Sequence, residues 1–174
     1  MDPKNVPNEE NALPPSTGGG EVRERPVTWT AGDGIRLKGR DWAPAGGGEW
    51  AVVALMHGMG EHSGRFADWA EALVGRGVAV TCLDQRGHGR SEGPRGHSPG
   101  YGWLMESVDG TLREAAERHP GVPVFLMGHS MGGNLALNYG LGWRAGGEEP
   151  GVARKVPEGK GSPPVVAGLI ASAP

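Results

Sequence analysis

Four runs of almost uninterrupted apolar residues constrain the fold of this chain most strongly. They read WAVVALMHG (50–58), VAVTCLD (78–84), VPVFLMGHS (122–130) and VVAGLIASAP (165–174). Continuous apolar runs, as opposed to alternating ones, are typical of strands buried on both faces of a parallel sheet. Segments with helical spacing of apolar residues lie between consecutive runs. This alternation predicts an α/β fold with a doubly wound, mostly parallel sheet.

Three other segments complete the predicted domain organisation. Residues 22–44 are interpreted as two further strands around the turn Asp33-Gly34, which brings the predicted sheet to about six strands. Residues 1–20 are polar and rich in Pro, Asn, Glu, Ser and Gly, so we expect a disordered tail before a folded region at 21–174. Residues 142–164 are charged and rich in Gly and Pro, and are interpreted as a solvated insertion.

Composition narrows the class of protein. The net charge of −3 gives no basic excess, so nothing favours a nucleic-acid partner. The one cysteine, Cys82, lies in an apolar run and fits a small buried hydrophobic residue in a reducing compartment better than a nucleophile. No run reaches the roughly 18 apolar residues of a membrane span, and the first residues lack an apolar signal core. We therefore expect a cytoplasmic protein.

The sequence GHSMGG directly after the third apolar run has the pattern of a nucleophile elbow. In such an elbow a sharp turn between strand and helix strains the serine backbone and exposes its hydroxyl. Gly128 and Gly132, two positions to either side, leave room for the turn to pack. Ser130 is the predicted nucleophile, and the backbone N–H of Met131 can stabilise a developing oxyanion. The alternative interpretation is an ordinary glycine-rich turn.

A second donor is predicted in LMHGMGEH, which follows the first apolar run. A loop of the type HG-x-G at this place brings the backbone N–H of Met59 beside the elbow. His57 is interpreted as structural, with a metal ligand or a base as the alternative. Glu61 and Arg65 follow, and they either line a polar entrance or solvate the start of a helix.

The loop DQRGHGRSEG after the second apolar run is interpreted as a tight, braced turn. Gly87 and Gly89 allow positive φ angles. Asp84, Arg86 and Arg90 are expected to brace the loop through ion pairs and hydrogen bonds. The alternative for Asp84 is the catalytic acid.

The strings HGMGEHSGR, DQRGHGRSEGPRG, HPGVPVFLMGHSMGGNLAL and GLIASAP resemble the α/β-hydrolase superfamily, in its monoacylglycerol lipase and lysophospholipase (serine aminopeptidase-like) branch. The resemblance covers residues 27–174 apart from the insertion. It implies Ser130 as nucleophile, Met59 and Met131 as backbone oxyanion donors, and Glu61 and Arg65 near the leaving alcohol. It implies a small lipid ester as substrate, with contact to lipid surfaces, and a chemistry that needs no cofactor and no metal.

One departure from the family pattern is large. The family order is Ser, then Asp, then His, but residues 131–174 contain no Asp and no His. We therefore expect the first part of a family member, without the lid and the last two strands, and little or no esterase activity from this chain alone. The alternatives are a non-catalytic pseudohydrolase or binding protein, and another activity of the superfamily such as an aminopeptidase or thioesterase. The oligomeric state is left open.

Overall fold

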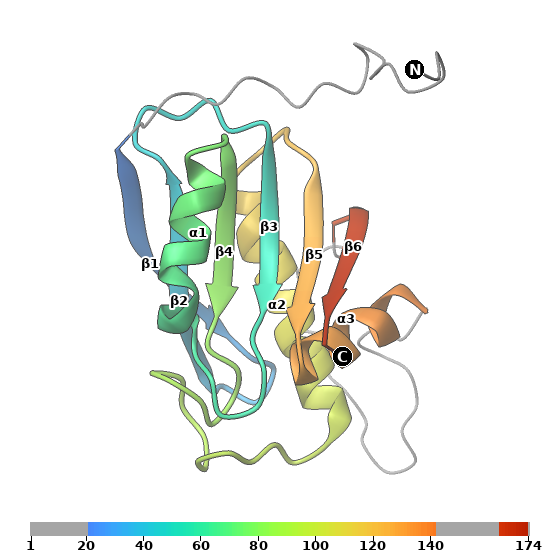
Figure 1. Cartoon of the computed structure of the whole chain (residues 1–174). Coiled ribbons are helices and arrows are strands. Elements are labelled where there is room, and N and C mark those ends of the chain that lie inside the picture. The colour runs from blue at the N-terminus through green and yellow to red at the C-terminus, as the bar shows by residue number, and fades with distance from the viewer. Residues whose placement is uncertain (1–20, 142–163, 174) are drawn as a thin grey trace.

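A six-stranded sheet with helices on both faces forms the folded part of the chain (Figure 1). The computed structural model describes residues 21–141 and 164–173. The strands are β1 (Val22–Thr30), β2 (Arg36–Pro44), β3 (Ala51–Met56), β4 (Val78–Leu83), β5 (Val124–His129) and β6 (Val166–Ser172). The helices are α1 (Ala67–Val74), α2 (Tyr101–Arg118) and α3 (Met131–Gly140), and the 3₁₀ helix η2 (Ser63–Phe66) precedes α1. The predicted tail at 1–20 lies outside the described residues, as does the predicted insertion apart from Pro164.

The strand order is β1-β2-β4-β3-β5-β6. β4, β3, β5 and β6 run parallel, and the predicted hairpin β1-β2 joins β4 in antiparallel pairing. The prediction of a doubly wound, mostly parallel sheet is therefore confirmed. Because parallel strands end at the same edge, the loops after β3, β4 and β5 emerge together, at the lower edge in Figure 1.

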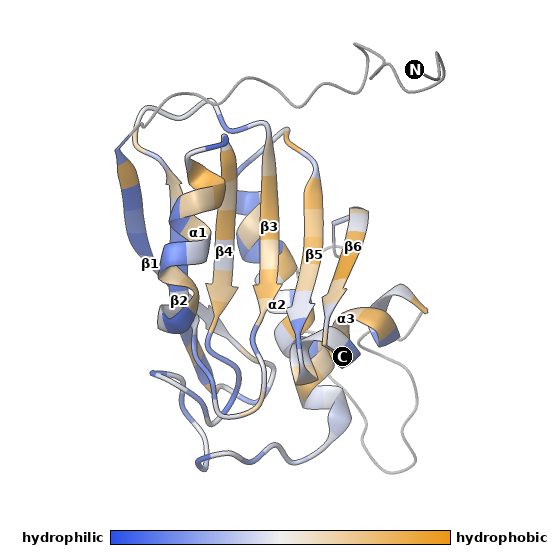
Figure 2. Ribbon diagram, in the orientation of Figure 1, coloured by the Kyte–Doolittle hydropathy of each residue, from blue (hydrophilic) through white to orange (hydrophobic). Residues whose placement is uncertain are grey.

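Each face of the sheet is covered by its own helices. Met105 and Leu112 of α2 and Leu135 of α3 belong to one buried cluster, whereas Val74 of α1 packs with Val80 on the opposite face. The central strands are the most hydrophobic part of the ribbon, as Figure 2 shows. Full burial of each such large aliphatic side chain contributes about 1.5–3 kcal/mol to the stability of the fold. The two apolar layers therefore fix the strands, and with them the loops at the strand ends.

Two further details concern α2 and β6. The α2 helix begins at Tyr101, before the apolar periodicity at 104–116 becomes visible. β6 is apolar on both faces, as for an interior strand, yet among the described residues it occupies the edge of the sheet and Ile170 is 46% exposed.

No helix in the described part of the chain is both long and apolar enough to cross a membrane.

Candidate active site

Ser130 lies at the turn between β5 and α3 in a backbone conformation that non-glycine residues rarely adopt. Its φ is 52° and its ψ is −120°. Such a conformation costs about 1–3 kcal/mol and persists only where the surroundings impose it. Here the Ser130 N–H donates to the Ser172 carbonyl at 2.8 Å, and the Ser130 carbonyl accepts from the Asn134 N–H at 3.1 Å. The end of β6 and the first turn of α3 therefore hold the strained residue from both sides.

Two glycines make this turn sterically feasible. A Cβ on Gly128 would overlap the carbonyl group of Gly132, and a Cβ on Gly132 would overlap the carbonyl of Met56 at the end of β3. The spacing of the glycines around Ser130 thus reflects close backbone packing.

The loop after β3 reaches the same turn. A Cβ built on Gly58 would lie 3.1 Å from the Ser130 Cβ, so the loop backbone packs directly against the serine. Met59 follows Gly58, and its side chain is 61% exposed. Met131 is the first residue of α3, where a backbone N–H has no acceptor within the helix. The predicted donors are the N–H groups of Met59 and Met131. Each belongs to the residue that directly follows one side of the contact between Gly58 and Ser130.

Glu61 lies two residues before η2 and Arg65 lies within it, and their side chains approach each other. The Glu61 Oε2 atom accepts a hydrogen bond from the Gly58 N–H at 2.8 Å, and Oε1 lies 3.8 Å from the Arg65 Nε. Through this hydrogen bond Glu61 stabilises the loop that carries Met59. Sequence reasoning did not predict this structural role. The Arg65 side chain is largely exposed.

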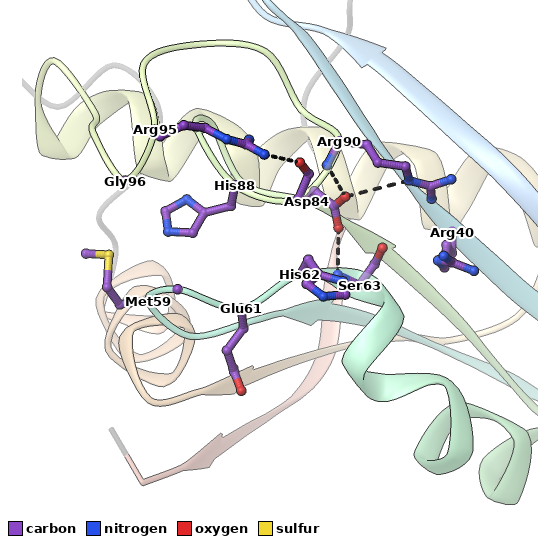
Figure 3. A pocket seen from close by; sticks show the side chains of 13 residues that line it. Arg40, Met59, Glu61, His62, Ser63, Asp84, His88, Arg90, Arg95 and Gly96 are labelled. Atoms are coloured by element: carbon purple, nitrogen blue, oxygen red, sulfur yellow. Dashed lines mark hydrogen bonds and ion pairs between the residues drawn. The ribbon is translucent and has the colours of Figure 1, made fainter.

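A pocket of about 670 Å³ separates the loop after β3 from the loop after β4. Met59, Glu61, His62 and Ser63 form one wall, and Asp84, His88, Arg90 and Arg95 form the other, as Figure 3 shows. The wall that includes Met59 and Glu61 is the loop that packs on Ser130. Ser130 itself does not line this pocket, which adjoins the serine only through the loop after β3.

Asp84 has a bracing role in this structure. One carboxylate oxygen accepts the Ser63 N–H at 2.6 Å and the other accepts the Arg90 N–H at 2.8 Å. The Arg90 guanidinium lies 3.9 Å from Asp84, but Arg86 pairs with Asp33 at 2.8 Å. Asp84 thus joins the two loops at the pocket, which agrees with the bracing interpretation; the expected brace at Arg86 instead ties the loop to the β1-β2 turn.

His57 is buried beneath the loop, and both of its ring nitrogens are occupied. Nδ1 lies 2.8 Å from the Gly58 carbonyl oxygen, and Nε2 accepts the Gln85 backbone N–H at 2.8 Å. Burial lowers the pKa of His57, which keeps the ring neutral. With no free nitrogen, His57 has the geometry of a structural residue and not of a base or metal ligand. Sequence reasoning missed Gln85. No signal in the sequence marks it, because its role depends on contact with His57 in another loop.

Among the described residues, no cluster of three or more His, Cys, Asp or Glu side chains has an arrangement that could hold a metal ion. The groups at the site are a hydroxyl, backbone N–H donors and paired polar side chains. Such an arrangement suits acyl transfer, in which a serine attacks a carbonyl carbon and N–H groups bind the oxyanion.

Several curated proteins to which the chain is similar are monoacylglycerol lipases. The chain is 40% identical over 105 residues to the human monoglyceride lipase, a match that covers 60% of this chain and 34% of the relative. It is 38% identical over 107 residues to a monoacylglycerol lipase of Mycolicibacterium smegmatis, covering 62% of this chain and 38% of the relative. The chain thus spans little more than a third of the length of these two relatives.

Solved structures and a family profile agree with these relatives. A thermostable carboxyl esterase from Bacillus coagulans superimposes with a TM-score of 0.59 at 25% identity, covering 67% of this chain and 39% of the esterase. Brefeldin A esterase, a bacterial homologue of human hormone-sensitive lipase, gives a TM-score of 0.54 at 25% identity, covering 75% and 39%. The profile of the Hydrolase_4 family, described as serine aminopeptidase, S33, matches residues 49–149. The chain therefore belongs to this family of the α/β-hydrolase superfamily, whose members include monoacylglycerol lipases and esterases.

Proposed function

We propose that the chain is the part of a monoacylglycerol lipase-like serine hydrolase that carries the nucleophile, and that Ser130 is this nucleophile. The observation that carries the proposal is the strained backbone of Ser130 at the end of a parallel strand, with φ of 52° and the helix α3 directly behind it. A protein retains such strain at a site where it serves a purpose. Here it presents a hydroxyl at the edge of the sheet where three loops converge.

In the proposed reaction the Ser130 Oγ attacks the carbonyl carbon of the ester. The Oγ–C bond forms, and the carbonyl oxygen becomes an oxyanion that the N–H groups of Met59 and Met131 stabilise. Collapse breaks the ester C–O bond and releases the alcohol, which takes up the proton lost by the serine. Water then hydrolyses the acyl-serine to the free acid. Glu61 and Arg65 are proposed to contact the alcohol portion of the substrate.

The proposed substrate is a small ester of a fatty acid, because the curated relatives named above are monoacylglycerol lipases. The exposed Met59 side chain beside the pocket offers an apolar surface at the entrance. We propose that the protein works in the cytoplasm in contact with lipid surfaces.

We also propose that these 174 residues alone turn over esters slowly or not at all. A serine hydrolase needs a base to accept the serine proton, and residues 131–174 contain neither His nor Asp. Removal of the base in a well-studied serine protease lowers kcat about 10⁶-fold. The oxyanion donors can still give about 10³–10⁴-fold acceleration over water.

Incubation with a fluorophosphonate probe followed by mass spectrometry tests both proposals. We expect slow labelling at Ser130, with fluoride as the leaving group, and no labelling in Ser130→Ala. Ser98→Ala, in the loop between β4 and α2, should label at the wild-type rate. Labelling that persists in Ser130→Ala would contradict the assignment of the nucleophile.

Hydrolysis of a monoacylglycerol provides the second measurement. A kcat in the ordinary enzyme range of about 1–10³ s⁻¹ would contradict the proposal of slow turnover. Specific binding of a monoacylglycerol with no labelling at any serine would instead favour the pseudohydrolase, which the missing Asp and His make the second candidate.

A further inference from the structure

The peptide group between Gly58 and Met59 is held at its carbonyl oxygen, and the peptide group before it is held at its N–H. The Gly58 carbonyl oxygen lies 2.8 Å from His57 Nδ1 and accepts the Glu61 N–H at 3.3 Å. The Gly58 N–H, on the preceding peptide, donates to the Glu61 carboxylate at 2.8 Å. A loop held by this many hydrogen bonds has little freedom to rotate its peptide planes.

The partners of His57 determine where its proton lies. A carbonyl oxygen only accepts hydrogen bonds, so the contact between Nδ1 and Gly58 requires a proton on Nδ1. A backbone N–H only donates, so the contact between Gln85 and Nε2 requires a bare Nε2. The Gln85 side-chain amide also donates to the His57 carbonyl. His57 and Gln85 are both completely buried, so no water competes for these contacts.

The geometry of a trans peptide transmits this constraint to the next residue. Within one peptide plane the C=O and N–H bonds point in opposite directions, and rotation about the C–N bond is blocked. The contact from His57 to the Gly58 carbonyl therefore sets the direction of the Met59 N–H. This arrangement differs from that of the Met131 N–H, whose direction is set by the helix α3 that it begins.

We propose that His57 is a positioning residue that aims the Met59 N–H at the reacting carbonyl oxygen, and that Gln85 holds His57 in the required tautomer. This inference rests on the proposed function, since it assigns to Met59 a role in binding the oxyanion. His57 contacts neither the substrate nor Ser130 in this role. It acts through one peptide plane, and Gln85 acts through His57.

Two substitutions of His57 separate the donor at Nδ1 from the acceptor at Nε2. In His57→Asn the short amide can place an N–H near the position of Nδ1 and keep the contact with Gly58. In His57→Gln the longer amide reaches the position of Nε2 and keeps the contact with the Gln85 N–H but not the contact with Gly58. Residual dipolar couplings of the ¹⁵N-labelled full chain report the direction of the Met59 N–H, with Met131 as internal control.

We expect the Met59 coupling to stay near the wild-type value in His57→Asn and to change in His57→Gln, while Met131 is unaffected in both. The rate of fluorophosphonate labelling at Ser130 should fall about 10²-fold in His57→Gln and only several-fold in His57→Asn, because loss of one oxyanion donor has that effect. A purely structural role would lower the unfolding midpoint in both variants and leave the Met59 direction unchanged in the folded molecules.

Two outcomes decide the inference, and a third concerns the proposed function. An unchanged Met59 coupling in His57→Gln would overturn it. If neither variant folds, the imidazole ¹⁵N shifts of the wild-type chain decide, because a proton on Nε2 in place of Nδ1 contradicts the proposed contact. Absence of any Ser130 labelling in the wild type would count against the proposed function alone, and the dipolar couplings would still test the positioning by His57.

Discussion

Replacement of Gly132 by alanine should cost this chain about 3 kcal/mol or more of its free energy of unfolding, at the upper end of what overpacking causes. The new Cβ would overlap the Met56 carbonyl and lie 2.8 Å from the His57 carbonyl oxygen. Both are backbone atoms at the end of β3, so no side-chain rotation relieves the clash. The helix α3 would have to withdraw from the sheet, and Leu135 would lose its buried position.

Urea unfolding of both Gly132→Ala and Gly46→Ala measures this effect. Gly46 lies between β2 and β3, where a Cβ meets no atom within 4 Å and the backbone has no positive φ. Its replacement should change stability by no more than about 0.5 kcal/mol. Equal stabilities of the two variants would contradict the steric argument. For a domain with a total stability of about 5–15 kcal/mol, the loss at Gly132 is a large fraction, so the pattern of glycines around Ser130 is also a requirement of the fold.

The sequence predicted those features whose causes lie within one segment. The apolar runs predicted β3, β4, β5 and β6 because a continuous apolar run is visible within a single segment of the sequence. The need for glycine at 128 has such a local cause, because a Cβ there would overlap the carbonyl group of Gly132, four positions further on, whereas a Cβ on Gly132 would overlap Met56 in another segment. Positive φ angles at Gly87 and Gly89 were predicted for the same reason and are found at 70° and 49°.

Features whose causes lie in distant segments could not be predicted. Gln85 contacts His57 across 28 residues, through two loops that meet only because β3 and β4 are neighbours in the sheet. His119 contacts Asp41 across 78 residues, in a cluster that depends on the register of β2 against β4. No local pattern marks these side chains, because the same residue types occur on solvated loops. Gln85 and His119 acquire their partners only when the strands pair in the folded protein.

The cluster around His119 joins the end of α2 to β2, to β4 and to the segment between β2 and β3. His119 Nε2 lies 2.9 Å from the Asp41 carboxylate, and Nδ1 lies 2.6 Å from the Glu49 carboxylate. The Thr81 hydroxyl also donates to Asp41 at 2.8 Å. The side chains of His119 and Asp41 have no exposed surface. Because carboxylates only accept, hydrogen bonds to both require a proton on each ring nitrogen and hence a charged imidazolium.

Burial by itself lowers the pKa of His119, but hydrogen bonds to Asp41 and Glu49 outweigh it and raise the pKa above the ordinary value of 6.5. Burial opposes ionisation of the two carboxyls as well, yet the contact with His119 leaves the pKa of each below its ordinary value, 3.8 for Asp41 and 4.5 for Glu49. A raised histidine pKa contributes stability that is complete below pH 6.5 and is lost as the pH rises through the folded value. The lowered pKa values of Asp41 and Glu49 contribute stability that is complete above pH 4.5 and is lost on acidification. The cluster therefore stabilises the fold most between these limits.

Substitution of His119 by phenylalanine keeps a ring in the site but removes both donors, and should cost about 3 kcal/mol at around pH 5.5. The buried Asp41 carboxylate and the partly buried Glu49 carboxylate both lose the imidazolium. Among the described residues, Asp41 then keeps only the Thr81 hydroxyl and the Arg25 guanidinium at 3.7 Å. The cost should shrink as the pH rises from about 5.5 to about 9, because loss of the imidazolium proton leaves a donor for only one of the two carboxylates. Addition of Asp41→Asn and Glu49→Gln to His119→Phe should recover much of the loss, since both unpaired charges are then gone. Urea unfolding of the three proteins at the two pH values provides the measurement. A cost of His119→Phe that is the same at both pH values would show that His119 contributes packing only, and that the charge of its imidazolium adds no stability.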